Sequence, residues 1–119
     1  MLNPIIDAVS EDGRSDISPR ALAQKLNLSV TDFADLIGVS RNSLNDKAAS
    51  PKVQAALTPI LQILSLAAQA TGSERRAVLW FKFNPITSLG IKTPMEHVRD
   101  GHPDWVLGHI ENVMNGVYA

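Results

Sequence analysis

The side chains that most often carry out chemistry in enzymes are present in this sequence, but their spacing matches no common catalytic arrangement. The histidines lie at positions 97, 102 and 109, whereas a helical metal site needs two of them four residues apart. Asp100 and Asp104 fit a solvated helix start better than an acid–base pair, and no serine stands in a nucleophile elbow. The absence of cysteine excludes a thiolate nucleophile, a zinc–thiolate site and a disulfide. We therefore expect no enzymatic activity, no bound metal and no cofactor.

A different chemistry, hydrogen bonding to the edges of DNA bases, is suggested by residues 32–48, "DFADLIGVSRNSLNDKA". Arginine can bond guanine and asparagine can bond adenine, while lysine meets phosphates, which position a protein without specifying sequence. The alternative is an ordinary helical hairpin whose polar face is only solvated. We predict that five polar side chains of this stretch contact DNA: Arg41, Asn42, Ser43, Asn45 and Lys47.

To bring such side chains to a groove, two short helices must cross steeply through a tight turn. We expect the first helix over residues 32–37, capped by Thr31, and the second over residues 41–48, capped by Ser40. Gly38 supplies the left-handed residue that ends the first helix. Small or apolar side chains at the right spacing hold both helices to a core, which is typical of a helix-turn-helix; they are Phe33, Ala34, Ile37, Val39 and Leu44.

The balance of charge limits the expected affinity for DNA. The formal net charge is -1; residues 1–71 hold six Lys/Arg and seven Asp/Glu, and residues 72–119 hold five of each. Strong nucleic-acid binders usually carry a basic surplus, so we expect modest affinity per monomer and a homodimer that doubles the contacts. Further phosphate contacts are expected from Arg20, Lys25 and Lys52.

Hydrophobic periodicity predicts an all-α fold, because alternation with a period of two never lasts more than a few positions. Residues 4–9 are expected to form a helical turn or two before a polar loop, and Ser18 with Pro19 opens a helix. Two later serine–proline or threonine–proline pairs, at Pro51 and Pro59, predict two helices or one kinked helix. Its buried stripe, which is also a plausible dimer seam, consists of Leu57, Leu61, Leu64 and Ala68.

The predicted chain divides at Gly72 into a helix-turn-helix bundle with linker helices, residues 1–71, and a small helical module, residues 72–119. In the module, Ser73 caps a helix that carries Trp80. Thr93 and Glu96 are expected to form a capping box. In it, the Thr93 hydroxyl accepts one of the free backbone N–H groups at the helix start, and the Glu96 side chain reaches back to accept another. The last helix runs from Pro103 to Gly116 and has a clean apolar stripe: Val106, Leu107, Ile110, Val113 and Met114.

Residues 77–119 resemble the toxin-binding domain of the Xre/MbcA/ParS antitoxins. The resemblance covers about 40 residues, and the helix-turn-helix before them matches the order usual in that family. One departure is the Asn84-Pro85 pair, where members usually have proline before asparagine. The residues that carry the resemblance are Trp80, Asn84-Pro85, Leu89-Gly90, Thr93-Pro94, Gly101, Val106 and the closing Gly116-Val117-Tyr118-Ala119.

The resemblance implies that the chain is an antitoxin and that its protein partner is a RES-domain toxin, an enzyme that degrades NAD. It also implies a hetero-oligomer with the toxin, in which the last residues of the antitoxin help to close the toxin's active site. The toxin-binding residues carried over in this way are Trp80, Gly116, Val117, Tyr118 and Ala119. Two alternatives stay open: the tail packs on its own domain, or the chain is a stand-alone helix-turn-helix regulator whose second half dimerises.

The sequence favours a cytoplasmic protein. Lack of cysteine fits a reducing compartment, and the first residues, "MLNPIIDAVSEDG", lack the basic region of a secretory signal. No apolar run approaches the ~18 residues that we expect of a membrane span. The nearest, "LTPILQILSLAAQA", is interrupted by Pro59, Gln62, Ser65 and Gln69.

Overall fold

The computed structural model describes residues 16–116, and this part of the chain is all-α, as predicted. The helical turn expected over residues 4–9 lies outside the described residues. Seven α-helices and one short 3₁₀ helix follow one another without a β-strand in the described part. They are α2 (Pro19–Lys25), α3 (Val30–Ile37), α4 (Arg41–Asp46), α5 (Pro51–Thr71), α6 (Glu74–Phe83), η1 (Thr87–Leu89), α7 (Pro94–Arg99) and α8 (Pro103–Met114).

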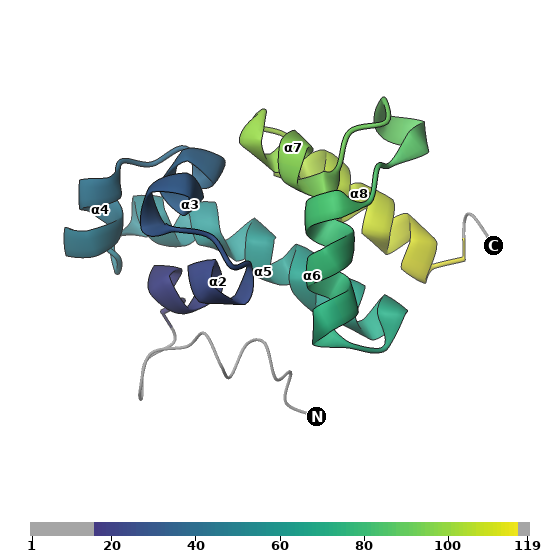
Figure 1. Ribbon diagram of the computed structural model, residues 1–119, viewed down its shortest axis with the longest axis horizontal. Helices are drawn as coiled ribbons and strands as arrows, with labels where there is room; N and C mark the ends of the chain where they lie inside the picture. The colour runs from purple at the N-terminus through teal and green to yellow at the C-terminus, as the bar shows by residue number, and fades with distance from the viewer. Residues whose placement is uncertain (1–15, 117–119) are drawn as a thin grey trace.

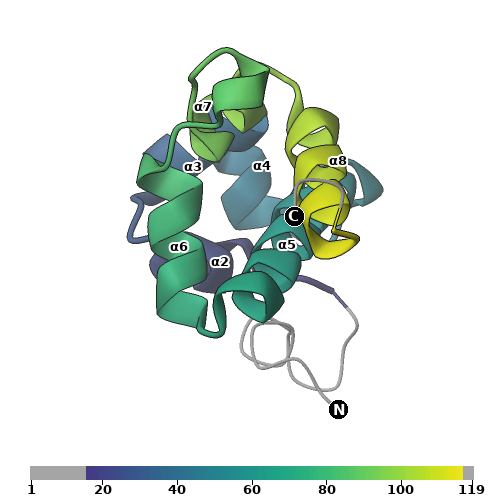
Figure 2. The ribbon, with the colours of Figure 1, turned by 90° about the vertical axis from the view of Figure 1, so that its right-hand side faces the viewer.

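The long helix α5 joins the two ends of the molecule. Figure 1 shows α2, α3 and α4 around one half of α5 and α6, α7 and α8 around the other half. Figure 2 shows α6 and α8 on opposite sides of α5. Most of the apolar residues that fill these contacts belong to one continuous cluster, which includes Leu22, Phe33, Leu57, Phe81 and Val106. The two predicted modules therefore share a core within residues 17–106.

Most helices begin at a serine or threonine whose hydroxyl accepts a backbone N–H three residues later, which satisfies one of the donors left free at a helix start. Ser18, Ser40 and Ser73 have this role, as predicted. The prediction that Thr31 caps the first helix of the helix-turn-helix was wrong. Ser29 accepts the N–H of Asp32 instead, so α3 begins two residues earlier. The second helix also ends earlier than expected, at Asp46.

Residues 51–71 form one uninterrupted helix in spite of Pro59. Pro59 lacks the N–H that would bond the Ala55 carbonyl one turn earlier. The nearby hydrogen bond from the Thr58 hydroxyl to the Gln54 carbonyl, at 2.8 Å, does not replace this missing bond. Contacts along α5 explain why the helix continues, because it packs against both α6 and α8. Of the two alternatives, the division into two helices at this proline is therefore incorrect, and residues 51–71 form a single helix.

The properties of α5 correct two expectations: that its apolar stripe is a dimer seam, and that no apolar run approaches the length of a membrane span. Leu57 and Leu64 are fully buried by their own chain, so the stripe cannot be the seam of a dimer. By length and composition, α5 could cross a membrane, since its 21 residues include a window of mean hydropathy 1.3. The central helix of a folded core has the same properties, and α5 buries its apolar face in such a core.

The second half of the chain follows the predicted helix starts closely. Thr93 and Glu96 form the capping box, with the Thr93 N–H donating to the Glu96 carboxylate at 3.0 Å and the Glu96 N–H donating to the Thr93 hydroxyl at 3.1 Å. The connection before α7 contains η1 and is closed by the Ile86 N–H donating to the Lys92 carbonyl at 2.9 Å. This pairing of Ile86 with Lys92 closes the connection, whose residues 88–90 lie beside α8.

Candidate functional site

The predicted helix-turn-helix is formed by α3, Gly38 and α4. Gly38 has φ +74°, the left-handed conformation that ends α3 and turns the chain. Phe33 is fully buried and Leu44 nearly so, so both helices are anchored in the common core. A helix of six residues then stands at one end of the molecule (Figure 1).

The polar side chains of α4 do not all face the same way. Successive residues of a helix are rotated by about 100°, so Asn42 and Asp46 lie opposite the buried Leu44, and both are exposed. Arg41 and Asn45 share the neighbouring flank. Ser43 is half-buried, and its hydroxyl lies 2.9 Å from that of Ser40. The outermost positions are therefore one amide and one carboxylate.

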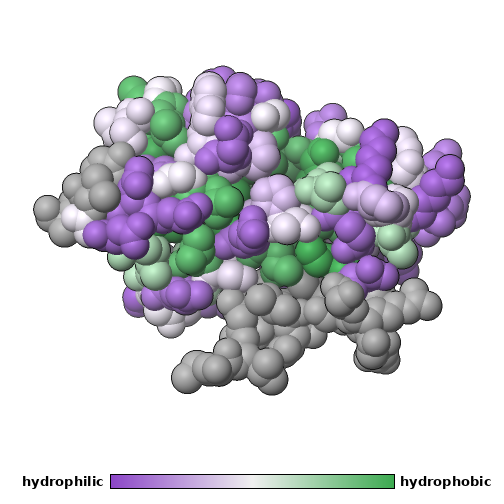
Figure 3. Space-filling view, turned by 180° about the vertical axis from the view of Figure 1, so that it is seen from behind, coloured by the Kyte–Doolittle hydropathy of each residue, from purple (hydrophilic) through white to green (hydrophobic). Residues whose placement is uncertain are grey.

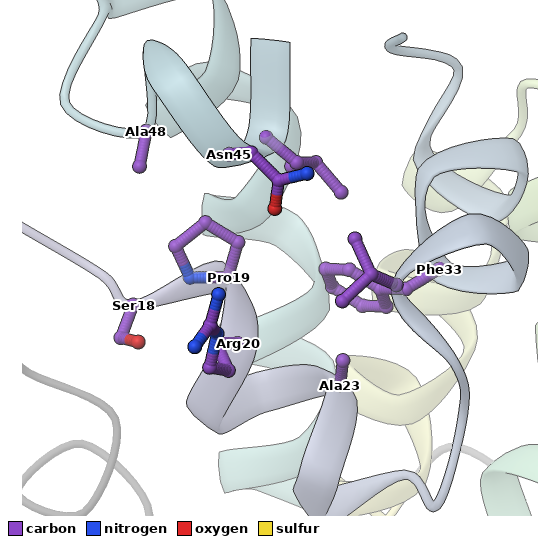
Figure 4. A pocket seen from close by; sticks show the side chains of 9 residues that line it. Ser18, Pro19, Arg20, Ala23, Phe33, Asn45 and Ala48 are labelled. Carbon is purple, nitrogen blue, oxygen red and sulfur yellow. The ribbon is translucent and has the colours of Figure 1, made fainter. Parts of the chain in front are cut away.

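Asn45 also lines a hollow between α2 and α4. Figure 4 shows its amide directed toward Pro19 and Arg20 of α2, with Phe33 at one side. The hollow has a volume of about 400 Å³. Of the five predicted DNA contacts, Arg41, Asn42 and Lys47 are thus exposed away from it, Asn45 stands at its rim, and Ser43 is drawn back toward Ser40.

The cations expected to meet phosphates are not all available. Lys25 forms an ion pair with Glu74, which links α2 to α6. Arg20, Lys47 and Lys52 are exposed and make no ion pair with the described part of the chain. Opposing them, Asp46 adds a negative charge to the outer face of α4, which reduces attraction to phosphates.

The predicted toxin-binding residues lie on different elements. Trp80 is half-buried in α6 and packs against the main cluster and against a smaller one formed by Ala67, Ala77 and Ile110. Gly116 is exposed after α8 with φ +78°. Val117, Tyr118 and Ala119 lie outside the described residues. Trp80 is therefore placed as a packing residue of its own chain.

Sequence reasoning missed the other tryptophan, Trp105, whose residue is 48% exposed. Its ring stacks on His102 with centroids 3.7 Å apart and meets the edge of the buried His97 at 5.8 Å. Spacings of four and seven residues along α8 place His109 and Asn112 on the same side as Trp105. This helical spacing could be predicted from the sequence, but nothing in the sequence indicated which of the two tryptophans the core would cover.

This outer side of α8 borders a second hollow, of about 560 Å³, between η1 and α8. Leu89, Trp105 and His109 are among the residues that line it. Partial burial lowers the pKa of His109, which favours the uncharged form of the ring. Nearby in sequence, Ile91 is 70% exposed and has φ +66°, an uncommon conformation for a β-branched residue. The lining of the hollow thus combines aromatic and apolar groups with polar ones and with one carboxylate, that of Asp104.

No group of three His, Asp or Glu residues within the described range is placed to hold a metal ion. Comparison of the chain with models of protein families, with curated proteins and with solved structures finds no match. The site must therefore be judged from its own geometry.

Proposed function

We propose that the chain is a cytoplasmic antitoxin that binds a RES-domain, NAD-degrading toxin with its second half and represses its own promoter with its first. The toxin is neutralised by occlusion of its active site, so the antitoxin itself performs no chemistry and needs no cofactor. The observation that carries the proposal is the outer side of α8. Trp105 is exposed there beside a hollow, and the chain continues past the end of α8 through the exposed Gly116.

Two further features support a protein partner for α8. The apolar stripe of the helix continues past the core, and Val113 and Met114 are each 40% exposed just before the tail. Large exposed apolar groups that lie close together are typical of interaction surfaces. A tail that follows them can extend the contact into a cleft of the partner.

The promoter-binding half is supported by α4. Its anchoring through Leu44 and its exposed Arg41 and Asn42 fit a helix that enters the major groove. The modest charge of the chain is adequate for autoregulation by a homodimer or by a complex with toxin. The alternative, a stand-alone regulator whose second half dimerises, would use the same α4 for DNA and the exposed residues of α8 for a second copy of the chain.

Co-expression with a RES-domain toxin encoded beside this gene tests the antitoxin proposal. Trp105→Ala and removal of residues 117–119 should each reduce protection of growth, and combined they should abolish it. The matched control is Ile91→Ala, an exposed apolar change outside α8. Trp80 is unsuitable, because its substitution disturbs packing. Full protection by the doubly altered chain, at equal soluble level, would exclude this surface.

DNA footprinting upstream of the gene tests the second half of the proposal. Arg41→Ala with Asn42→Ala should remove the footprint, whereas Gln24→Ala, an exposed change on α2, should not. Binding should weaken several-fold or more between ~50 and ~200 mM salt if phosphates contribute. An unchanged footprint with the α4 double variant would mean that this helix does not read DNA.

A further inference from the structure

The outer side of α6 is both cationic and apolar. Ala77 and Phe81 face the core, and helical geometry places five other residues on the opposite side. Leu79 and Phe83 are 47% and 64% exposed there. Figures 1 and 2 show that no described helix covers this side of α6. The five residues, which we call the α6 face, are Arg75, Arg76, Leu79, Lys82 and Phe83.

The cations of the α6 face have no acidic partner within residues 16–116. Arg75, Arg76 and Lys82 form none of the ion pairs in this region, and the acid at the start of α6, Glu74, is paired with Lys25. Two arginines in the first turn also oppose the helix dipole, which favours anions there. The face therefore lacks negative charge as well as apolar cover.

The first residues of the chain have the complementary pattern. Leu2, Ile5, Ile6 and Val9 are spaced three, four and seven residues apart, which gives one apolar side to a short helix. Asn3 and Pro4 are suitable as its cap and first residue. Residues 10–16 follow with Glu11, Asp12 and Asp16 against a single Arg14.

This segment is tethered within reach of the α6 face. Ile17 is fixed on α5, where its N–H donates to the Gln54 side chain at 2.8 Å. From there α2 runs about 10 Å to Lys25, which contacts Glu74 at the start of α6. Residues 10–16 can span about 23 Å when extended. A hollow of about 390 Å³ at the seam of α2 and α6, lined by Arg75, Val78 and Leu79, lies on this route.

We propose that residues 2–12 of the same chain dock on the α6 face. Glu11 and Asp12 reach Arg75 and Arg76 near α2, and the apolar residues then cover Leu79 and Phe83. An eight-residue helix is about 12 Å long and α6 about 15 Å, so the segment fits along it. This inference is independent of the proposed antitoxin function.

The rival surface is the groove between α5 and α8, of about 540 Å³, with Leu66 and Leu107 among its lining residues. It lies on the opposite side of α5, and apolar patches are visible on this rear face of the molecule (Figure 3). The groove contains Glu111 and no cation. Charge therefore favours the α6 face for an acidic segment.

Paramagnetic relaxation in the full-length chain tests the proposal. The sequence has no cysteine, so Ala8→Cys gives a single site for a spin label that lies off the apolar stripe. Amide signals of α6 should be lost, while those of α4 persist. Arg75→Glu with Arg76→Glu should restore the α6 signals, and Lys52→Glu, an exposed control on α5, should not. Adding Glu11→Lys with Asp12→Lys to the arginine variant should bring the loss back.

Three results would overturn the docking of this segment on its own α6. They are loss of signals at Leu66 and Leu107 instead of α6, no loss anywhere in residues 16–116, and loss of α6 signals only between chains. The last is measured by mixing a spin-labelled unenriched chain with an unlabelled isotope-enriched chain. A relaxation effect that is unchanged by dilution supports binding within one chain.

Discussion

At the scale of single residues, the capping box at the start of α7 couples stability to pH. The backbone N–H of Thr93, and then its hydroxyl, bond the Glu96 carboxylate and lower its pKa. A lowered carboxyl pKa stabilises the fold above the ordinary pKa of glutamate, and this stabilisation is lost as the pH falls through the lowered value. Thr93→Ala should raise the pKa of Glu96 and cost about 1 kcal/mol at neutral pH.

NMR titration of the Glu96 side chain, with thermal unfolding at neutral and acidic pH, measures both effects. Glu96→Gln is the matched variant, because it keeps a hydrogen-bonding group but cannot titrate. Its deficit in stability relative to the natural chain should shrink as the pH is lowered. A Glu96 pKa that does not respond to Thr93→Ala would contradict the hydroxyl's role.

Two glycines predict alanine substitutions of opposite sign. A Cβ atom would meet nothing within 4 Å at either Gly38 or Gly108, but only Gly38 has a positive φ. Gly38→Ala should therefore destabilise by about 1 kcal/mol because of the left-handed backbone. Gly108→Ala, inside α8, should stabilise by about 0.5–1 kcal/mol. Urea denaturation of both variants checks the pair. Stabilisation by Gly38→Ala would contradict a cost of the left-handed backbone, and destabilisation by Gly108→Ala would contradict free space at that position.

At the scale of helices, Pro59 is the clearest test of what holds α5 together. It removes one backbone hydrogen bond within the helix, and proline is about 3 kcal/mol less favourable than alanine in a helix interior. Because the tertiary contacts already keep α5 continuous, Pro59→Ala should stabilise the protein by roughly 1–3 kcal/mol. Pro51→Ala, at the first position of the same helix, should be nearly neutral. Chemical denaturation measures both, and destabilisation by Pro59→Ala would mean that its ring packs better than alanine.

Helix starts could be predicted from sequence where one residue alone decides, as at Ser18, Ser40 and Thr93. Ser29 and Thr31 are both good caps, and Val30 packing against the core decided between them. The sequence left open whether Pro59 divides the helix, because packing against neighbours distant in sequence decides this. The candidate site was only partly predictable for the same reason. Local spacing indicated α4, but whether Trp80 or Trp105 would be exposed depends on where α6 and α8 meet α5.

At the scale of the whole molecule, the shared core predicts that the two halves unfold together. Phe33 in α3 and Phe81 in α6 are both fully buried in one cluster, although they lie in different predicted modules. Substitution of either by alanine should cost about 3–5 kcal/mol. If the core is one unit, each change also lowers the stability of the other half.

The two tryptophans make this measurable. Both lie in the second half, at 80 and 105, so fluorescence reports that half, while circular dichroism reports all helices. In the natural chain and in both variants, the two transitions should coincide. Phe81→Ala should also speed hydrogen exchange of core amides in α3, and Phe33→Ala that of core amides in α6. Separate transitions, with Phe33→Ala leaving the fluorescence midpoint unchanged, would show that residues 16–71 and 72–116 fold independently. Coincident transitions would mean that partner binding at α8 can stabilise α4 through the same core.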